Sequence, residues 1–322
     1  MIVEEGKNSI NLAVDFLQRG EIVAIPTETV YGLAADATNS SAIEKIYKAK
    51  NRPLYNPLIA HVADITMAQK YCNIDNLSMY LMKEFWPGAL SLVLPLYRDS
   101  KINDKALAGL STVALRCPQG IFNDIINAFK LPLVAPSANI SGSISTTNAE
   151  AVAQNLKEKV SLIIDGGACP IGVESTIIKV HEKKLFILRP GGISYEILRL
   201  ALDKFIDFDV EIVDIASDKI EAPGMLSSHY APNAFVRLNA TEIYEGEALL
   251  AFGQQDCKNV KKAVFSLNLS ISSNLEEAAH NLFNFLHLLD KKNVKTIAVQ
   301  PIPNKGLGVA INDRLTRAAF RK

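Results

Sequence analysis

Short apolar runs alternate with amphipathic stretches over residues 1–205. The apolar runs have the length of strands, and the stretches between them repeat apolar residues at helical spacing. Strands are predicted at residues 22–25, 58–62, 90–96, 112–115, 133–135, 162–164, 176–180 and 185–188, and helices at 10–19, 41–50, 63–71, 121–129, 147–157 and 195–202. Helices that interleave with strands predict an α/β sheet covered by helices.

Local signals refine two of these elements. Ser41 and Glu44 have the spacing of a capping box for the helix that runs to about Lys50. The strands at 176–180 and 185–188 are close enough in sequence to pair as a hairpin. We therefore expect a mixed sheet rather than a purely parallel one.

The periodicity weakens after residue 205. Residues 206–233 are expected to form a linker, since they include almost all of the stretch EAPGMLSSHYAPNA (221–234), whose Pro, Gly and small polar residues are typical of an extended segment. Residues 234–322 regain a pattern and predict a smaller second α/β domain. Its strands are expected at 248–252, 263–266 and 296–300, and its helices at 275–289, capped by Asn274, and at 307–320.

Composition agrees with two folded domains. The chain has 322 residues, of which 48% are hydrophobic, and domains usually span about 100–200 residues. The formal net charge is zero, whereas a general nucleic-acid binder normally has a basic excess. The sequence has no apolar run long enough to span a membrane and no signal-peptide pattern, and its four cysteines form no CxxC pair. We expect a cytoplasmic protein with reduced thiols and no membrane contact.

Polar clusters follow several predicted strands and one helix, where open α/β sheets place their ligands. The stretch PTETVYGL follows the strand at 22–25, and Lys50-Asn51-Arg52-Pro53 ends the helix at 41–50. Lysine and arginine there either complement the helix dipole or clamp phosphate oxygens. Arg116 ends another strand, where it is either a solvated charge at the strand end or a residue that binds the carboxylate of a ligand.

Three further clusters complete the set. The loop APSANISGSIS, residues 135–145, has small residues whose backbone N–H groups can approach an anion. Glu174-Ser175-Thr176 opens a strand and Arg189-Pro190-Gly191 closes the next. Ser228-His229-Tyr230 lies in the linker, where a histidine is more often a surface residue than a base. His280 and His287, on the helix at 275–289, are expected to be structural.

Each cluster is weak alone, but their order and spacing resemble one family. PTETVYGL, KxRP with NPL, the strand-end arginine, APSANISG, ESTI and RPGG are similar to the threonylcarbamoyl-AMP synthase family with a YrdC-like fold. APGMLSSHYAP and GLGVAINDRLTRAA resemble the linker and the end of the accessory domain in its long members. The resemblance implies a twisted, mixed-sheet YrdC-like catalytic domain and a smaller Rossmann-like domain, with the linker lying across the catalytic cavity.

The resemblance also implies an activity. Members of this family join ATP, L-threonine and bicarbonate, with Mg²⁺ bound through the ATP phosphates, and release pyrophosphate. A separate transferase then uses threonylcarbamoyl-AMP to modify an adenosine of tRNA. The resemblance therefore implies that transferase as a partner, and it leaves open whether the chain also contacts tRNA itself.

The same resemblance assigns site residues by motif. Positions matching the threonine site are Thr29, His61, Arg116, Ala135 and Ser175. Positions matching the ATP site are Arg52, Asn56, Thr112, Ser137, Asn139, Ser145, Arg189 and Tyr230. Lys50 and Arg52 form the basic element expected to act catalytically on the phosphates, and no residue is expected to bind a metal directly.

Two departures from the family pattern leave fine loop geometry open. Asn51 stands where many members have glycine, and Gln119 stands where many have histidine.

The sequence also bears on two rival functions. A double-stranded RNA-binding module without catalysis is disfavoured by the neutral net charge. A carbamoyl transferase of the hydrogenase-maturation type would carry zinc-finger cysteine pairs and an acylphosphatase-like region, which this chain lacks.

Overall fold

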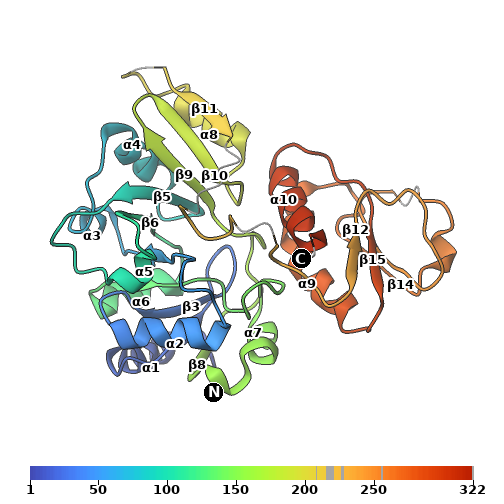
Figure 1. Ribbon diagram of the computed structural model, residues 1–322, viewed down its shortest axis with the longest axis horizontal. Helices are drawn as coiled ribbons and strands as arrows, with labels where there is room; N and C mark the ends of the chain where they lie inside the picture. Colours follow the sequence, from blue (N-terminus) through green and yellow to red (C-terminus); the bar gives the residue numbers. More distant parts are fainter. Residues whose placement is uncertain (208, 215–220, 226–227, 255–256, 321–322) are drawn as a thin grey trace.

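The computed structural model describes the chain except for residues 208, 215–220, 226–227, 255–256 and 321–322. Two α/β domains lie side by side, with residues 228–234 leading into the smaller one (Figure 1). Parts of the expected linker, residues 206–233, therefore fall outside the described residues. The larger domain is built on an eleven-stranded sheet and the smaller one on a four-stranded sheet.

The large sheet is mixed, as the sequence predicts. Its strands run in the order β1-β8-β2-β3-β7-β4-β6-β5-β9-β10-β11. Their bounds are β1 Ile2–Glu4, β2 Val23–Ile25, β3 Gly32–Asp36, β4 Ile59–His61, β5 Leu90–Pro95, β6 Thr112–Arg116, β7 Leu133–Val134, β8 Leu162–Asp165, β9 Thr176–His181, β10 Lys184–Arg189 and β11 Glu211–Asp214. The expected hairpin is confirmed, because β9 and β10 pair antiparallel.

Helices cover this sheet and bury their apolar faces against it. Their bounds are α1 Lys7–Gln18, α2 Ser40–Lys50, α3 Ile65–Ala68, α4 Asn76–Phe85, α5 Asp104–Leu107, α6 Ile121–Phe129, α7 Ala149–Leu156 and α8 Tyr195–Leu202, with a 3₁₀ turn at Lys157–Lys159. The expected capping box of α2 is wrong. Asn39 caps this helix instead, since its side chain accepts from the N–H groups of Ser41 and Ala42.

The small domain has a parallel sheet in the order β12-β15-β13-β14. Its elements are β12 Phe235–Arg237, β13 Ala248–Ala251, β14 Phe265–Asn268, β15 Thr296–Val299, the helices α9 Leu275–Asp290 and α10 Leu307–Ala319, and a 3₁₀ turn at Val260–Lys262. Asn274 caps α9, as predicted, by accepting from the N–H of Glu277. The helices α9 and α10 lie on the side of the small sheet that faces the large domain (Figure 1).

The two domains share part of one hydrophobic core. Val30, Ile144 and Val173 of the large domain pack in the same buried cluster as the residues that line the core of the small domain. His280 and His287 on α9 reach the large domain, where their ring nitrogens lie 3.1 Å from the carbonyl oxygens of residues 169 and 145. Both histidines therefore contribute to the domain interface.

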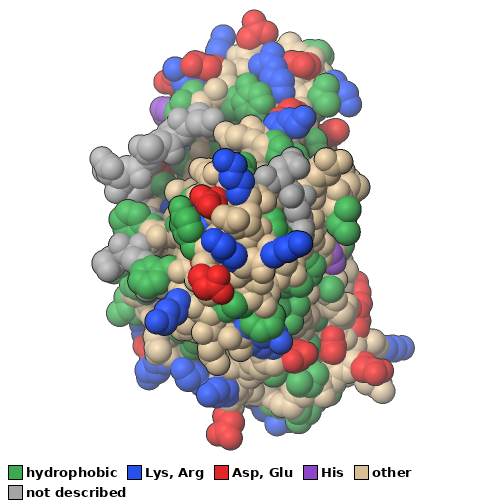
Figure 2. Space-filling view, turned by 90° about the vertical axis from the view of Figure 1, so that its right-hand side faces the viewer, with side chains coloured by type: hydrophobic (Ala, Val, Ile, Leu, Met, Phe, Trp, Pro, Cys, Tyr) green, Lys and Arg blue, Asp and Glu red, His purple; other side chains and the backbone are tan. Residues whose placement is uncertain are grey.

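Surface and thiol chemistry add two observations. The four cysteines are buried thiols rather than disulfides. Within the part of the chain that the structure describes, no helix is long and apolar enough to cross a membrane. On the face that the small domain presents in Figure 2, basic and acidic side chains are interspersed rather than gathered by sign.

Candidate active site

Strand pairing brings the polar residues of four strands to one edge of the large sheet. The parallel neighbours β4 and β6 end together, with His61 directly opposite Arg116. The antiparallel strand β5 places Ser91 opposite Arg116 from the other side. Ser175 immediately precedes β9, which runs parallel to β5, and the Oγ atoms of Ser91 and Ser175 are 2.8 Å apart. Residues from distant parts of the sequence thus meet at this edge.

Arg189 closes this edge from the end of β10. Its Nε and Nη2 donate to the carbonyl oxygen of Ser175 at 3.2 and 2.8 Å, and Nη2 also donates to the Ser175 Oγ at 3.1 Å. Nη1 donates to the carbonyl oxygen of Pro223 in the linker at 3.3 Å. Arg189 therefore ties the linker to the start of β9.

The linker covers a small buried cavity at this edge. Tyr230, His229, Gly224 and Pro223 line one side of it, and the cavity has a volume of only about 50 Å³. Ligand sites usually measure about 300–1,000 Å³. The structure is thus closed over the site, as the resemblance implies for the linker.

Eight of the predicted site residues line this cavity together. They are Arg52, His61, Arg116, Ala135, Ser137, Ser175, Arg189 and Tyr230. Apolar neighbours include Val30, Ile59 and Pro136, and one further charged group, Glu174, also lines it. Both sets of predicted positions, for the amino acid and for the nucleotide, therefore converge on one place.

The remaining predicted residues do not line the cavity. Lys50 is buried, and its Nζ donates to the carbonyl oxygens of Ser137 and Asn139. Burial, followed by the nearby charge of Arg52, lowers the pKa of Lys50 well below its usual range. In this conformation Lys50 therefore holds the loop at 135–145 in place.

Asn56 and Asn139 also lie behind the lining, whereas Thr112 is not brought to this cavity. The backbone carbonyl of Asn56 accepts from the Arg52 Nε at 3.1 Å, so Asn56 helps to aim that guanidinium. The side-chain Nδ2 of Asn139 donates to the backbone carbonyl oxygens of residues 140 and 143, both at 2.9 Å. Thr112 begins β6, at the opposite end of that strand from Arg116, and borders a narrow crevice beside Pro223.

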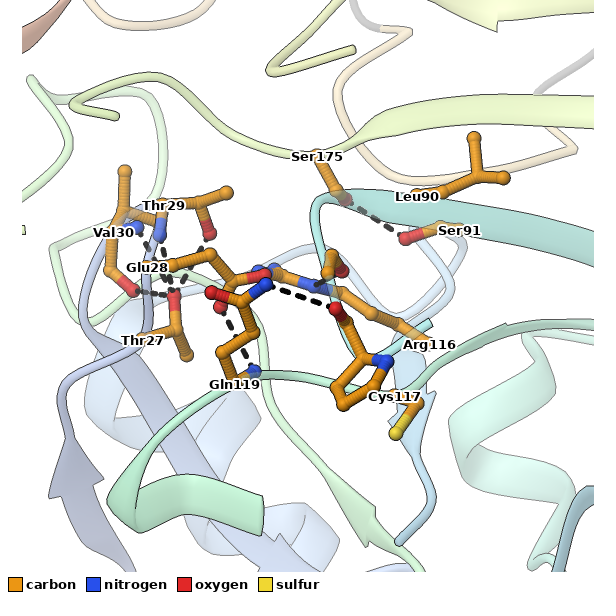
Figure 3. A network of polar contacts seen from close by, with 12 residues as sticks. Thr27, Glu28, Thr29, Val30, Leu90, Ser91, Arg116, Cys117, Gln119 and Ser175 are labelled. Atoms are coloured by element: carbon orange, nitrogen blue, oxygen red, sulfur yellow. Dashed lines mark hydrogen bonds and ion pairs between the residues drawn. The ribbon is translucent and has the colours of Figure 1, made fainter. Parts of the chain in front are cut away.

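Arg116 meets a carboxylate that the sequence did not single out. An Nη2 atom of Arg116 lies 2.8 Å from Oε1 of Glu28, and both side chains are almost fully buried (Figure 3). Neither of these two atoms has a well-aligned hydrogen bond. The Arg116 Nε donates to the carbonyl oxygen of Gly88 at 3.2 Å. The guanidinium is thus fixed in place but only partly satisfied.

Thr29 belongs to the turn that carries Glu28. Its Oγ1 lies 2.8 Å from the Oγ1 of Thr27, which also donates to the carbonyl oxygen of Val30 (Figure 3). The backbone N–H of Gln119 donates to Glu28 Oε2 at 3.2 Å, so the position where this chain departs from the family pattern contacts the site through its backbone.

Glu174 belongs to a polar cluster named from the sequence, but it was given no role there, and it is the second carboxylate of the site. Its Oε1 accepts from the Ser145 hydroxyl at 2.6 Å, and its Oε2 accepts from Arg314 of α10 at 2.7 Å. Burial alone would raise the pKa of Glu174, but the guanidiniums of Arg314 and Arg189 lower it to about 2. Glu174 is therefore ionised. The predicted residue Ser145 is held in place by its hydrogen bond to this carboxylate.

Two histidines in the site are held neutral. Burial, with a smaller contribution from Arg116, lowers the pKa of His61 to about 3. Burial also lowers the pKa of His229 to about 3. The expectation that His229 is a surface residue is wrong, because the linker turns inward there and leaves the side chain only 6% exposed.

Buried polar atoms without hydrogen-bond partners gather at this site. Among the described residues they belong to Glu28, Asn56, His61, Arg116, Asn139 and His229. Of these, His61, Arg116 and His229 line the cavity, and the atoms of Glu28 and Arg116 form an ion pair with each other. Buried polar groups are normally satisfied, so such a concentration marks a place where ligand atoms complete the hydrogen bonding. This concentration is the strongest indication from geometry alone that the cavity is a binding site.

Two other features were tested as alternatives. A larger cavity of about 760 Å³ lies between α8, β10 and α10, but none of the predicted site residues lines it. Over the described ranges, no three His, Cys, Asp or Glu side chains gather as a metal site. Glu174, which lines the small cavity, and Glu28, which pairs with the lining residue Arg116, already face arginines. The oxygen atoms that coordinate a divalent ion here would therefore have to come from a bound substrate.

The missed residues did carry sequence signals. Glu28 and Glu174 lie inside the PTETVYGL and ESTI motifs, and Arg314 lies inside GLGVAINDRLTRAA. Their roles depend on which partner the fold places opposite them, and a single sequence does not give that pairing.

Two family models match the chain over most of its length. The Sua5/YciO/YrdC model, described as telomere recombination, matches residues 15–191. A second model, described as the C-terminal domain of threonylcarbamoyl-AMP synthase, matches residues 193–320.

Similar proteins extend over nearly the whole chain. The threonylcarbamoyl-AMP synthase of Bacillus subtilis is 39% identical over 320 residues, covering 95% of this chain and 92% of the relative. The enzyme of the same name from Pyrococcus abyssi is 37% identical, covering 98% and 95%. A crystal structure of Pyrococcus abyssi Sua5 complexed with L-threonine superimposes with a TM-score of 0.87 and 34% identity, covering 99% of this chain and 97% of that one.

Proposed function

This chain belongs to the threonylcarbamoyl-AMP synthase family, and we propose on that premise that it joins ATP, L-threonine and bicarbonate into threonylcarbamoyl-AMP and pyrophosphate. The likeness to a full-length structure that holds L-threonine supports the amino-acid substrate. The partly satisfied Arg116 and the unpartnered ring nitrogens of His61 and His229, which all line one cavity, are the observation in this chain that supports the site.

The chemistry requires cations and hydrogen-bond donors rather than a nucleophilic triad. The amine of threonine and bicarbonate form a carbamate with loss of water. A carbamate oxygen then forms a bond to the α-phosphorus of ATP while the bond to the pyrophosphate oxygen breaks. Negative charge accumulates throughout, so positioning and electrostatic stabilisation dominate the catalysis.

Arg116 is proposed to bind the threonine carboxylate. It is fixed by Gly88 and Glu28, yet its Nη2 lacks a well-aligned hydrogen bond, and guanidiniums bind carboxylates in a bidentate manner. The neutral His61, Ser175 and Ala135 line the same cavity as Arg116, and Thr29 lies in the turn next to Glu28, the partner of Arg116. A neutral imidazole can accept a hydrogen bond from the threonine amine or hydroxyl without repelling a cation.

The phosphates are proposed to lie along Arg52 and Arg189. Ser137 and Tyr230 line the same cavity, while Lys50, Asn56, Asn139 and Ser145 support it from behind. The assignment of Thr112 to ATP rests on the resemblance alone. Mg²⁺ would be carried by the phosphate oxygens and would neutralise part of their charge, in line with the reluctance of this ion to lose its waters.

The linker is proposed to act as a lid. Tyr230 and His229 close a cavity too small for a nucleotide, so the linker has to move for ATP to enter. Exclusion of water would protect both the carbamate and the acyl-adenylate. The product would pass to a separate transferase that modifies tRNA. An RNA-binding role without catalysis is not favoured, because the arginines of this edge are buried rather than displayed on an open face.

The test is release of pyrophosphate by the purified full-length chain from ATP and Mg²⁺. L-Threonine and bicarbonate are supplied together and then omitted one at a time. We expect release only when both are present. Release that needs neither would indicate simple ATP hydrolysis, and no release under any condition would contradict the proposal.

A further inference from the structure

One arginine of the small domain reaches into the site of the large domain. Arg314 lies on α10, and its side chain is 0% exposed. Its Nε donates to Oε2 of Glu174 at 2.7 Å, and its Nη2 donates to the carbonyl oxygen of Pro190 at 3.0 Å. Asp313, the preceding residue, pairs with Nη1. All three nitrogens of the guanidinium therefore have a partner, and two of the partners, Glu174 and Pro190, belong to the large domain.

The same guanidinium also contacts the linker. The Arg314 Cζ lies 5.0 Å from the ring centroid of Tyr230, a cation–π distance. Phe283 of α9 stacks on Tyr230 with ring centroids 5.6 Å apart. The Tyr230 side chain is 1% exposed and its backbone has a left-handed φ of 63°, so this tyrosine adopts a constrained conformation. Contacts from two helices of the small domain hold it there.

Glu174 depends on Arg314 for its charge balance. The carboxylate is buried beside the cavity and receives the Ser145 hydroxyl on one oxygen and Arg314 on the other. A buried carboxylate without its partner is costly, and loss of a partner from such a pair changes the geometry of the remaining groups. Ser145, Tyr230 and Arg189 are all assigned to ATP, and all three lie next to Glu174 or Arg314.

We propose that Arg314 is a positioning residue for the nucleotide half of the active site. It fixes Glu174 and Tyr230 together, so that the small domain completes the ATP-binding cavity. The inference rests on the proposed function, because ATP is the ligand assigned to these residues. It predicts a selective effect on ATP, since the proposed threonine ligands Arg116 and His61 make no contact with Arg314.

The experiment uses the full-length chain with Arg314→Met, Arg314→Lys and the control Arg237→Met. Arg237 pairs with Glu247 and lies over the Tyr244 ring, all within the small domain, so its loss tests ion-pair removal away from the site. For Arg314→Met we expect a rise of about tenfold or more in the KM for ATP, with the KM for threonine changed by less than about threefold. Arg314→Lys should recover part of the loss, because it keeps the charge without the planar fork.

The linker provides a readout that does not depend on catalysis. The N–H of His229 donates to the carbonyl oxygen of Arg317 at 3.3 Å, and the N–H of Ala231 donates to that of Gly142 at 2.8 Å. Hydrogen exchange of a peptide covering residues 228–234 should accelerate in Arg314→Met and not in Arg237→Met. Affinity for a non-hydrolysable ATP analogue, measured by calorimetry, should fall in parallel.

A double variant covers the case in which Arg314→Met does not fold. Glu174→Gln with Arg314→Met removes the unpaired carboxylate but still deprives Tyr230 of its cation, and we expect the KM for ATP to stay raised. Equal losses of ATP and threonine affinity, or ATP affinity and linker exchange like those of the unsubstituted chain, would overturn the inference. If the unsubstituted chain releases no pyrophosphate, the proposed function fails, whereas the calorimetry and exchange still decide the role of Arg314.

Discussion

Arg116 and Glu28 face each other in a part of the site that water barely reaches. Their atoms approach to 2.8 Å without aligning, and each side chain is tied to the backbone of another segment, Gly88 for the arginine and Gln119 for the glutamate. The pair therefore holds the guanidinium at the end of β6 while leaving donor capacity for a substrate carboxylate. Glu28 gives the arginine a fixed direction rather than a complete set of partners.

The residue-scale prediction concerns threonine. Arg116→Ala should raise the KM for threonine by about two orders of magnitude, because removal of a buried charged partner typically costs about 2–5 kcal/mol. Steady-state pyrophosphate release at varied threonine concentration measures it. Arg98→Ala, at an exposed arginine, is the control.

A complication is that Arg116→Ala leaves Glu28 unpaired. The double variant Arg116→Ala with Glu28→Gln removes that charge, and its threonine KM should remain high. A threonine dependence close to that of the unsubstituted chain in either variant would contradict the assignment of Arg116.

At the scale of an element, the end of α2 decides where the basic residues point. Asn51 caps this helix in the left-handed region, with φ 51° and ψ 42°. Glycine adopts this conformation freely and asparagine tolerates it better than most residues. The departure from the glycine of many family members therefore preserves the turn, and Arg52 follows it directly into the cavity.

Substitutions at Asn51 should separate backbone strain from chemistry. Asn51→Gly should leave both the free energy of unfolding and the KM for ATP almost unchanged. Asn51→Val should lower the free energy of unfolding by about 1–3 kcal/mol, since a β-branched residue resists positive φ, and it should raise the KM for ATP by misdirecting Arg52. Urea unfolding and steady-state kinetics measure the two effects; equal stability of the Gly and Val variants would contradict this view of the turn.

Most amphipathic helices and several strands were predictable from the sequence, but the ten-residue helix α4, the short helix α5 and several strands were not. Helices α6 and α8 begin and end where their apolar periodicity does. In contrast, β3 is GLAAD, whose small residues give no strand signal although its position in the sheet buries it. The short strands β1, β11 and β12 lie at sheet edges, where tertiary pairing rather than sequence pattern defines them.

The candidate site was likewise only partly predictable from the sequence. Motif order identified most of the residues that line the cavity, including Arg116 and Arg189. The partners of those residues depend on which segments the fold brings together, so the roles of Glu28, Glu174 and Arg314 needed the structure.

At the scale of the whole molecule, the two domains and the linker form one unit around the site. The shared core around Val30, Ile144 and Val173 and the buried pair of Glu174 with Arg314 join the domains by apolar and charged contacts. Motion of the linker is therefore coupled to the packing of the small domain.

This arrangement predicts that stability depends on pH. Burial lowers the pKa values of His61 and His229 to about 3 in the folded protein, whereas an unfolded histidine titrates near ~6.5. Between these values the unfolded chain binds more protons, so the free energy of unfolding falls as the pH drops below about 6.5. Glu174, with its lowered pKa of about 2, adds a further loss only below about pH 4.5.

Urea unfolding at pH 7.5 and 5.5 measures this dependence. We expect the free energy of unfolding to be lower at pH 5.5 by roughly 1–3 kcal/mol. His229→Asn should reduce the difference, and His181→Asn, at an exposed histidine, should not. Equal stability at the two pH values would show that the buried histidines are accessible to protons in the folded state.

The central claim is that one site joins three substrates, and the product tests it most directly. The full-length chain is incubated with ATP, Mg²⁺, L-threonine and ¹³C-labelled bicarbonate, and the products are analysed by mass spectrometry. The account predicts threonylcarbamoyl-AMP that carries one ¹³C atom and forms together with pyrophosphate, and it predicts that Arg116→Ala makes little of it at low threonine. Threonyl-AMP without the label, or ADP and phosphate alone, would contradict the account.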